Sequence, residues 1–173
     1  ILLDITNIGY DIVPFLKNIR KERIVCGLII LSEKKAKDEV VALLEAGADD
    51  FMEKPIHPSE LKARIEILIG HKYPSQEDIS FKNLKMSTSS RSLSMDGKNV
   101  YLTKSEYDIL FLLLKNEGRL VYKEDMAKHL SGQSAVYFYN YEILYTHMKN
   151  LKRKLGSTAK RIKTIYGTGY MIE

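Results

Sequence analysis

The stretch HMKNLKRKLGSTAKRIKTIYGTGYMIE, residues 147–173, joins a basic helical pattern to a short hairpin pattern. The helical pattern spans about residues 140–155, and four of its apolar side chains share one face: Leu144, Met148, Leu151 and Leu155. The hairpin pattern carries paired glycines, Gly167 and Gly169, at its turn. A basic helix followed by a tight ribbon predicts a winged helix-turn-helix, with the helix in a DNA major groove and the wing on the sugar-phosphate backbone.

The face of this helix opposite its apolar stripe carries cationic and hydrogen-bonding side chains. They are Glu142, Tyr145, Thr146, Lys149, Asn150, Lys152 and Arg153. Side chains of these kinds contact base edges and phosphates, although an ordinary solvated helix face has a similar composition. The hairpin that follows favours the DNA-binding interpretation, in which this face points outward.

The basic charge of the chain is concentrated in its second half. Residues 1–76 contain 11 Lys and Arg against 12 Asp and Glu, whereas residues 77–173 contain 16 against 10. Residues 149–163 alone contain seven basic side chains and no acidic one. Such a cluster is the electrostatic footprint of a polyanion-binding protein.

Residues 79–131 predict the rest of this second domain. Residues 79–103 alternate as strands do, with a hairpin turn at Asp96-Gly97. Thr103 and Glu106 have the spacing of a capping box at the start of a helix that ends before Gly118. A shorter helix is expected near 123–130.

Three segments together resemble the DNA-binding domain of OmpR/PhoB-type response regulators: LTKSEYDILFLLLKNEGRLVYKEDM (102–126), HMKNLKRKLG (147–156) and IKTIYGTGYMIE (162–173). The resemblance covers essentially all of residues 79–173 and implies double-stranded DNA as the partner. The residues that it places at the DNA are Tyr145, Thr146, His147, Lys149, Asn150, Lys152, Arg153, Thr164, Tyr166, Thr168 and Tyr170. It also implies a contact with RNA polymerase at roughly residues 130–140. Tyr166 replaces an Arg that is common in the family, and Glu142 stands where the family often has a cation.

The first half of the chain alternates short apolar runs with amphipathic segments. Strands are predicted at 1–4, 24–31 and 49–55, and helices at 13–22, 37–47 and 59–70, with Gly47 ending one helix and Ser59 capping another. This alternation predicts a parallel sheet covered by helices on both faces. Asp4, Ser32 and Lys54 fall at the carboxyl ends of the strands, where such sheets bind ligands. Cys26, inside an apolar run, is expected in the core.

The segments LLDITNIGYD (2–11), IILSE (29–33) and GADDFMEKP (47–55) resemble the third, fourth and fifth strands of a receiver domain. The resemblance implies that Asp4 accepts a phosphoryl group from a histidine kinase, that Ser32 and Lys54 bind it, and that Phe51 is the aromatic switch residue. It further implies a cis Lys54-Pro55 bond, and Mg²⁺ with Asp4 as one ligand when the receiver is intact. On this resemblance the chain begins partway through a receiver, and we expect a longer gene product.

A homodimer is expected through the receiver face that includes Glu45, Asp49, Asp50, Lys62 and Arg64, whose charges resemble those of the family. Other positions depart from the family pattern. Glu33 follows Ser32 where a small residue is usual, Ile8 replaces a Pro, and Val40 replaces a Lys. These departures leave open an atypical regulator that dimerises without phosphate.

Together these patterns predict part of an α/β receiver at 1–72, a linker at 73–78 and an α+β winged helix-turn-helix domain at 79–173. The predicted function is that of a bacterial transcription regulator that binds tandem half-sites as a dimer. The alternative from another class is a signalling module that works by protein contact and binds DNA weakly.

An enzyme is disfavoured, because the four histidines lack metal-ligand spacing and no P-loop or nucleophile elbow is present. No apolar stretch approaches the length of a membrane span, and the single cysteine suits the cytoplasm.

Overall fold

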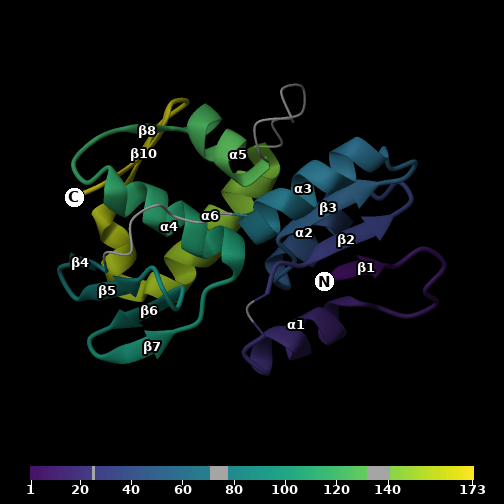
Figure 1. The fold of residues 1–173 in the computed structure, drawn as a ribbon, viewed down its shortest axis with the longest axis horizontal. Helices are drawn as coiled ribbons and strands as arrows, with labels where there is room; N and C mark the ends of the chain where they lie inside the picture. The colour runs from purple at the N-terminus through teal and green to yellow at the C-terminus, as the bar shows by residue number, and fades with distance from the viewer. Residues whose placement is uncertain (25, 71–77, 132–140) are drawn as a thin grey trace.

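The computed structural model describes residues 1–24, 26–70, 78–131 and 141–173. They form two packed units, an N-terminal unit of residues 1–70 and a C-terminal unit of residues 78–173 (Figure 1). Nearly all of the predicted linker, and all but the first two residues of the expected polymerase contact at 130–140, lie outside the described residues.

The N-terminal unit is built on a parallel sheet, as predicted, and its strands have the order β1-β2-β3. The strands are β1 (Leu2–Asp4), β2 (Ile29–Ser32) and β3 (Asp50–Glu53). The helices that follow them in turn are α1 (Val13–Lys21), α2 (Lys37–Glu45) and α3 (Pro58–Gly70). The register pairs Asp4 with Leu31 and Ser32 with Glu53, so the carboxyl ends of all three strands lie at one edge.

The helices cover both faces of this sheet. Ile30 packs in a buried cluster with Leu16 of α1 and Leu43 of α2. Neighbouring side chains of a strand point to opposite faces, so Ile29 faces the other side. There α3 approaches closely: a Cβ on Gly27 would lie 3.0 Å from Cβ of Leu68.

Two local predictions in this unit were wrong. Strand β2 begins at Ile29 instead of residue 24, and Cys26 is therefore exposed on the segment before the strand, not buried in the core. Helix α3 begins at Pro58, so Ser59 is not its N-cap. The fixed φ of proline suits the first helical position, which moves the start of the helix before the serine.

The C-terminal unit opens with an antiparallel sheet in the order β4-β5-β6-β7. Its strands are β4 (Ile79–Phe81), β5 (Leu84–Ser87), β6 (Ser92–Met95) and β7 (Lys98–Val100). Asp96 and Gly97 both have positive φ, 52° and 76°, as the predicted hairpin turn requires.

Three helices and a second small sheet complete the unit. The helices are α4 (Lys104–Lys115), α5 (Lys123–Ser131) and α6 (Tyr141–Leu155), and a 3₁₀ helix spans Gly156–Arg161. The sheet has the order β8-β10-β9, from β8 (Val121–Tyr122), β9 (Ile162–Ile165) and β10 (Gly169–Ile172). The predicted capping box at the start of α4 is confirmed: Thr103 N donates to Glu106 Oε2 at 2.8 Å, and Glu106 N donates to Thr103 Oγ1 at 3.4 Å.

The two units meet along helices α2 and α6, which lie side by side (Figure 1). Ile143 of α6 packs against the buried cluster of the N-terminal unit. None of the helices in the described part of the chain has both the length and the apolar character needed to cross a membrane.

Candidate nucleic-acid interface

Helix α6 is fixed in orientation by its apolar face. Leu144, Leu151 and Leu155 are fully buried in the core of the C-terminal unit, and Met148 is nearly so, as the helical period predicted. Helix α5 precedes α6 and packs on it, and the β9–β10 hairpin follows it. The expected helix-turn-helix with a wing is therefore present.

The C-terminal half of α6 and the wing form one cationic surface. Lys149 is 68% exposed at its side chain, and Arg153 is also exposed. Lys152 links the helix to the wing, because its Nζ donates to Thr164 Oγ1 at 3.0 Å and lies 5.4 Å from the ring centroid of Tyr170. Partial burial lowers the pKa of the Lys152 ammonium.

The wing turn places an aromatic side chain at its tip. Gly167 has a φ of +71°, and Tyr166 before it is 98% exposed. Thr168 Oγ1 donates to the carbonyl of Tyr166 at 3.2 Å, within the turn. Gly169 has no room for a side chain, because an added Cβ would lie 2.1 Å from the carbonyl oxygen of Val121. The wing is thus held against β8 while Tyr166 projects into solvent.

Part of the face that was expected to point outward is buried instead. Thr146, His147 and Asn150 are between 1% and 7% exposed. His147 Nε2 donates to the carbonyl of Asp49 at 2.8 Å, and Asn150 Nδ2 lies 3.4 Å from the carbonyl of Leu44. The expectation that this face points outward toward DNA was wrong for Thr146 and Asn150. A helical wheel sorts the faces of one helix but does not reveal what packs on them.

Asp4 and Lys54 come together at the carboxyl edge of the parallel sheet, as predicted. Lys54 Nζ donates to Asp4 Oδ2 at 2.5 Å and to Thr6 Oγ1 at 2.8 Å. The hydrogen bond from Lys54 to Asp4 comes first among the causes that lower the pKa of Asp4 from 3.8 to about 2, followed by hydrogen bonds from the side chain and the backbone N of Thr6. Ser32 is buried beside them, and its carbonyl accepts from Lys54 N at 2.8 Å. Thr6 was not predicted at this site, although a hydroxyl residue two positions after the acid could have indicated it.

The structure also shows where the other residues predicted at this edge of the sheet lie. Phe51 is half-buried against the cluster that contains Ile30, Glu33 is exposed, and the Lys54-Pro55 bond is cis, as expected. No group of three or more His, Cys, Asp or Glu side chains within the described residues is arranged to hold a metal ion. The donor set of these residues does not by itself fit Mg²⁺, and Asp4 as a metal ligand stays a prediction.

The five residues predicted for a dimer face are engaged in different ways. Glu45 Oε1 accepts from Lys149 Nζ of α6 at 2.5 Å. Asp50 pairs with Arg64 at 2.5 Å, and Arg64 also pairs with Glu60. Lys62 is 76% exposed and lies 3.8 Å from Glu66.

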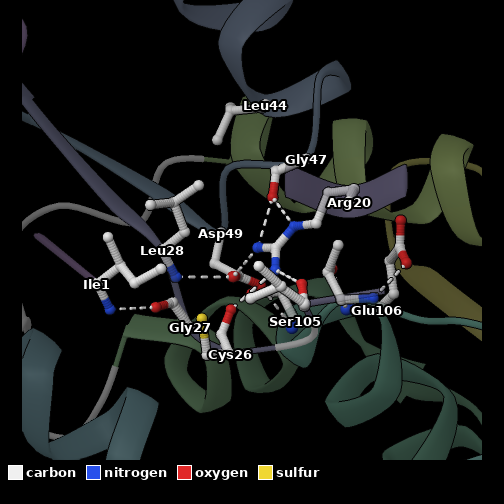
Figure 2. A network of polar contacts seen from close by, with 12 residues as sticks. Ile1, Arg20, Cys26, Gly27, Leu28, Leu44, Gly47, Asp49, Ser105 and Glu106 are labelled. Atoms are coloured by element: carbon white, nitrogen blue, oxygen red, sulfur yellow. Dashed lines mark hydrogen bonds and ion pairs between the residues drawn. The ribbon is translucent and has the colours of Figure 1, made fainter. Parts of the chain in front are cut away.

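Asp49 is the fifth of these residues, and its side chain is fully buried (Figure 2). Its Oδ2 accepts from Arg20 at 2.9 Å and from Leu28 N at 3.0 Å. Its Oδ1 accepts from the backbone N of Ser105 in the C-terminal unit at 2.9 Å. The participation of Arg20 and Ser105 was not predicted.

Two protein families match the chain. Residues 1–66 match the family described as response regulator receiver domain, and residues 97–172 match the family described as transcriptional regulatory protein, C terminal.

The response regulator ArlR of Staphylococcus haemolyticus is 28% identical over 172 residues, 99% of this chain and 78% of that protein. ArlR of Staphylococcus aureus is 30% identical over 145 residues, 84% of this chain and 66% of that protein.

Solved structures resemble the chain as well. A mutant of RitR superposes with a TM-score of 0.73 at 19% identity, covering 99% of this chain and 77% of that one, which shows the fold. The DNA-binding domain of Klebsiella pneumoniae RstA, solved in complex with the RstA box, is 26% identical with a TM-score of 0.50. It covers 56% of this chain and 96% of that one.

Proposed function

The chain belongs to the OmpR/PhoB family of response regulators and is a DNA-binding transcriptional regulator, and we propose that it binds DNA with α6 in the major groove and the β9–β10 wing on the backbone. One observation carries the proposal: Lys152 joins the recognition helix to Thr164 of the wing. Cations and hydroxyl groups from two elements therefore lie on one surface that can span a groove edge and its phosphates.

Within this surface the side chains have different roles in the proposal. Lys149, Lys152 and Arg153 contact phosphates or guanine edges, since cations favour both. Tyr166 meets the sugar-phosphate backbone or minor groove from the wing tip with a ring and a hydroxyl. Recognition by this chain therefore does not use an arginine at that position of the wing.

We propose that phosphorylation of Asp4 regulates this activity. The carboxylate is ionised at physiological pH, because its pKa lies at about 2. One of its oxygens attacks the phosphorus of a phosphohistidine, the P–O bond forms, and the P–N bond breaks to release the imidazole, which takes up a proton. The Lys54 ammonium, now 2.5 Å from Asp4 Oδ2, then faces the phosphoryl oxygens and neutralises part of their charge.

Family membership supports further proposals. A histidine kinase is the phosphodonor, RNA polymerase is a protein partner, and a homodimer on tandem half-sites is the DNA-bound form. A cytoplasmic location agrees with all of these.

A second candidate is regulation without phosphate, with the N-terminal unit acting as a dimerisation platform. The exposed carboxylate of Glu33, directly after Ser32, favours it, because a negative charge beside the phosphoryl oxygens is repulsive.

The test measures binding of the full-length gene product to a duplex from upstream of its own gene, and to a random duplex, by fluorescence anisotropy. Arg153→Ala should weaken binding roughly tenfold, since such contacts contribute about 1–3 kcal/mol. The control Lys98→Ala removes an exposed cation on strand β7, and its affinity should stay within about twofold of the native value. Equal affinity of both variants and the native protein would contradict the proposed surface.

A parallel arm adds a small phosphodonor and compares Asp4→Asn. If the donor tightens binding and Asp4→Asn abolishes the gain, phosphorylation controls the protein. If binding is tight and the same in every arm, the candidate without phosphate is correct.

A further inference from the structure

An open cavity of about 460 Å³ lies between helices α1 and α2, beside the turn that follows Asp4. Its lining comes from residues 5–13, which are the turn after β1 and the start of α1, and from residues 35–43 of α2 and the segment before it. We call it the α1–α2 cavity. None of its lining residues was assigned to DNA, to the phosphoryl group or to the dimer face. Its volume lies in the range of small-molecule sites.

The deepest part of the α1–α2 cavity is apolar. Ile5, Ile12 and Leu43 line it and are between 2% and 7% exposed. All three belong to the buried cluster of the N-terminal unit, and the half-buried Ile8 packs against that cluster. The cavity therefore exposes the edge of a packed core, and a ligand that covers this apolar floor removes it from water.

A cation with a loose partner stands in the same lining. Lys35 is 30% exposed at its side chain, and its Nζ lies 3.5 Å from Glu39 Oε1. That distance is longer than the roughly 2.8 Å of a charge-assisted hydrogen bond between an ammonium and a carboxylate. Glu39 is held at the start of α2 instead, because its Oε2 accepts from Ala36 N at 2.9 Å, and this bond comes first among the causes that lower its pKa. Lys35 is therefore able to bind a second anion without disturbing the helix start.

The other acid in the lining has a comparable role. Asp11 Oδ1 accepts from Val13 N at 3.0 Å at the start of α1. Both carboxylates of the lining are thus hydrogen-bonded to backbone N–H groups at helix starts, where the helix dipole offsets part of their charge. Tyr10, also in the lining, is 69% exposed and offers a ring to an apolar ligand. The cavity combines an apolar floor, an aromatic side chain and one loosely paired ammonium.

We propose that the α1–α2 cavity binds a small molecule with an apolar body and a single carboxylate, the body on the apolar floor and the carboxylate on Lys35. Small-molecule sites are commonly built in this way, from apolar walls with a few placed polar groups that fix orientation. An amine in place of the carboxylate would face the Lys35 ammonium, and repulsion would oppose its binding. The site is separate from the DNA-binding surface and does not depend on it.

A ligand in the α1–α2 cavity contacts the turn that holds Asp4. Ile5 directly follows Asp4, and Ile8 N donates to Ile5 O at 3.3 Å within the turn. Between them, Thr6 N donates to Asp4 Oδ1 at 2.9 Å, and Thr6 Oγ1 accepts from Lys54 at 2.8 Å. The amide resonance of Thr6 therefore reports on an occupied cavity from the side of Asp4.

The test is an NMR titration of the full-length protein that follows its backbone amides. The probe is octanoate, which has an apolar tail and one carboxylate. Octylamine has a tail of similar length with a cationic head, and acetate has the head alone. Octanoate should shift the amides of residues 5–13 and 35–43 in a saturable way, whereas octylamine and acetate should leave them nearly unchanged at the same concentrations.

Three variants locate the ligand. Lys35→Gln should weaken octanoate binding roughly tenfold, as for the loss of one hydrogen bond between charged groups. The control Lys34→Gln makes the same charge change on an exposed neighbour outside the lining, and its affinity should stay within about twofold of the native value. Ala42→Phe places a ring in the cavity and should abolish binding. If Ala42→Phe does not fold, the comparison of Lys35→Gln with Lys34→Gln decides.

Each contrary result overturns a stated part of the proposal. If octylamine binds as tightly as octanoate, or if Lys35→Gln binds octanoate like the native protein, the carboxylate class is wrong. If octanoate shifts no amide in residues 5–13 or 35–43, the cavity is not a ligand site. The proposed DNA binding is measured with duplexes and with other variants, so it stands or fails separately from these outcomes.

Discussion

Asp4 and Asp49 are carboxylates near strands of the same sheet, but their surroundings give them different roles. The Asp4 side chain is 51% exposed and pairs with one lysine, which leaves it accessible for the proposed phosphorylation. The Asp49 side chain is fully buried and accepts hydrogen bonds from Arg20, Leu28 and Ser105, which makes it a structural link. Charge alone did not distinguish the two; accessibility and hydrogen bonding do.

At Asp4 we expect the pKa to depend on Lys54. The Lys54 hydrogen bond is the largest cause of the lowered pKa, so Lys54→Gln should return the pKa of Asp4 toward 3.8. Because the pKa of Asp4 is lower in the folded state than in the unfolded state, the ionised carboxylate stabilises the fold at pH values above 3.8. This stabilisation is lost as the pH falls from 3.8 toward about 2. The difference in stability between native protein and variant should therefore vanish at the acid end of that window.

Titration of the Asp4 carboxyl carbon by NMR measures this shift. Glu39 is an internal control, because its pKa is lowered by Ala36 N and by Lys35 and should not respond to Lys54→Gln. An unchanged Asp4 pKa in the variant would refute the assignment of the cause.

At Asp49 we expect a loss of stability. Asp49→Asn removes the charge that pairs with Arg20. Asparagine has only one acceptor oxygen, so the hydrogen bonds to either Arg20 and Leu28 N or Ser105 N are lost. The free energy of unfolding should fall by roughly 2 kcal/mol, as for a buried polar group left without a partner.

Urea denaturation of the full-length protein measures the effect. Asp11→Asn is the matched control: Asp11 is exposed and accepts from Val13 N at 3.0 Å, and asparagine keeps a side-chain oxygen that can accept this hydrogen bond. Equal losses for the two variants would show that Asp49 is not a link between the units.

Among the helices, α4 has a start that is held by side chains from both units. Its start has the Thr103–Glu106 capping box, and Glu106 Oε2 also accepts from Lys154 Nζ of α6 at 2.6 Å. In the same first turn, Ser105 N donates a hydrogen bond to Asp49 Oδ1 of the N-terminal unit. The beginning of α4 is therefore tied to the recognition helix and to the neighbouring unit at once.

Loss of the cap should be measurable. Thr103→Ala removes the side chain that accepts from Glu106 N and should lower the free energy of unfolding by about 1 kcal/mol. Thr103→Ser keeps the hydroxyl and should be nearly neutral. Thermal unfolding of both variants checks this, and an equal loss in Thr103→Ser would point to the methyl group instead of the cap.

In the whole molecule, helix α2 of the N-terminal unit packs on helix α6 of the C-terminal unit. Ion pairs Lys37–Glu142 and Lys149–Glu45 join α2 to α6 at the exposed margin, and the contacts of Asp49 and Ile143 lie inside it. Salt should therefore weaken the exposed ion pairs at the margin of this interface, whereas the buried contacts of Asp49 and Ile143 should be little affected.

DNA affinity of the whole molecule should fall steeply with salt. Phosphate contacts by Lys149, Lys152 and Arg153 would give a slope of about −2.7 in log K against log salt, or roughly 40-fold weaker binding between about 50 and about 200 mM. Anisotropy titrations over that range measure the slope. Arg153→Ala should reduce its size by about 0.9, and a flat dependence in the native protein would contradict phosphate contacts.

Features that depend on local order along the chain could be predicted from the amino-acid sequence. The alternation of strands and helices, the Asp96-Gly97 turn, the capping box and the apolar face of α6 were all predicted, because each follows from backbone preference or hydrophobic period. The resemblance to receiver strands likewise predicted that Asp4 and Lys54 meet at one edge, since parallel strands bring their carboxyl ends together.

Features that depend on contacts between residues far apart in the chain could not be predicted and are seen in the folded protein. The tertiary structure exposed Cys26, made Arg20 the partner of Asp49, and buried His147 and Asn150 of α6 under residues about 100 positions earlier in the chain. The physical reason is that a helical period specifies which side of a helix is polar, whereas the partner of that side depends on how two separately patterned units pack. The same polar face can satisfy its hydrogen bonds on DNA or on the chain itself, and the packing of the units selects the second.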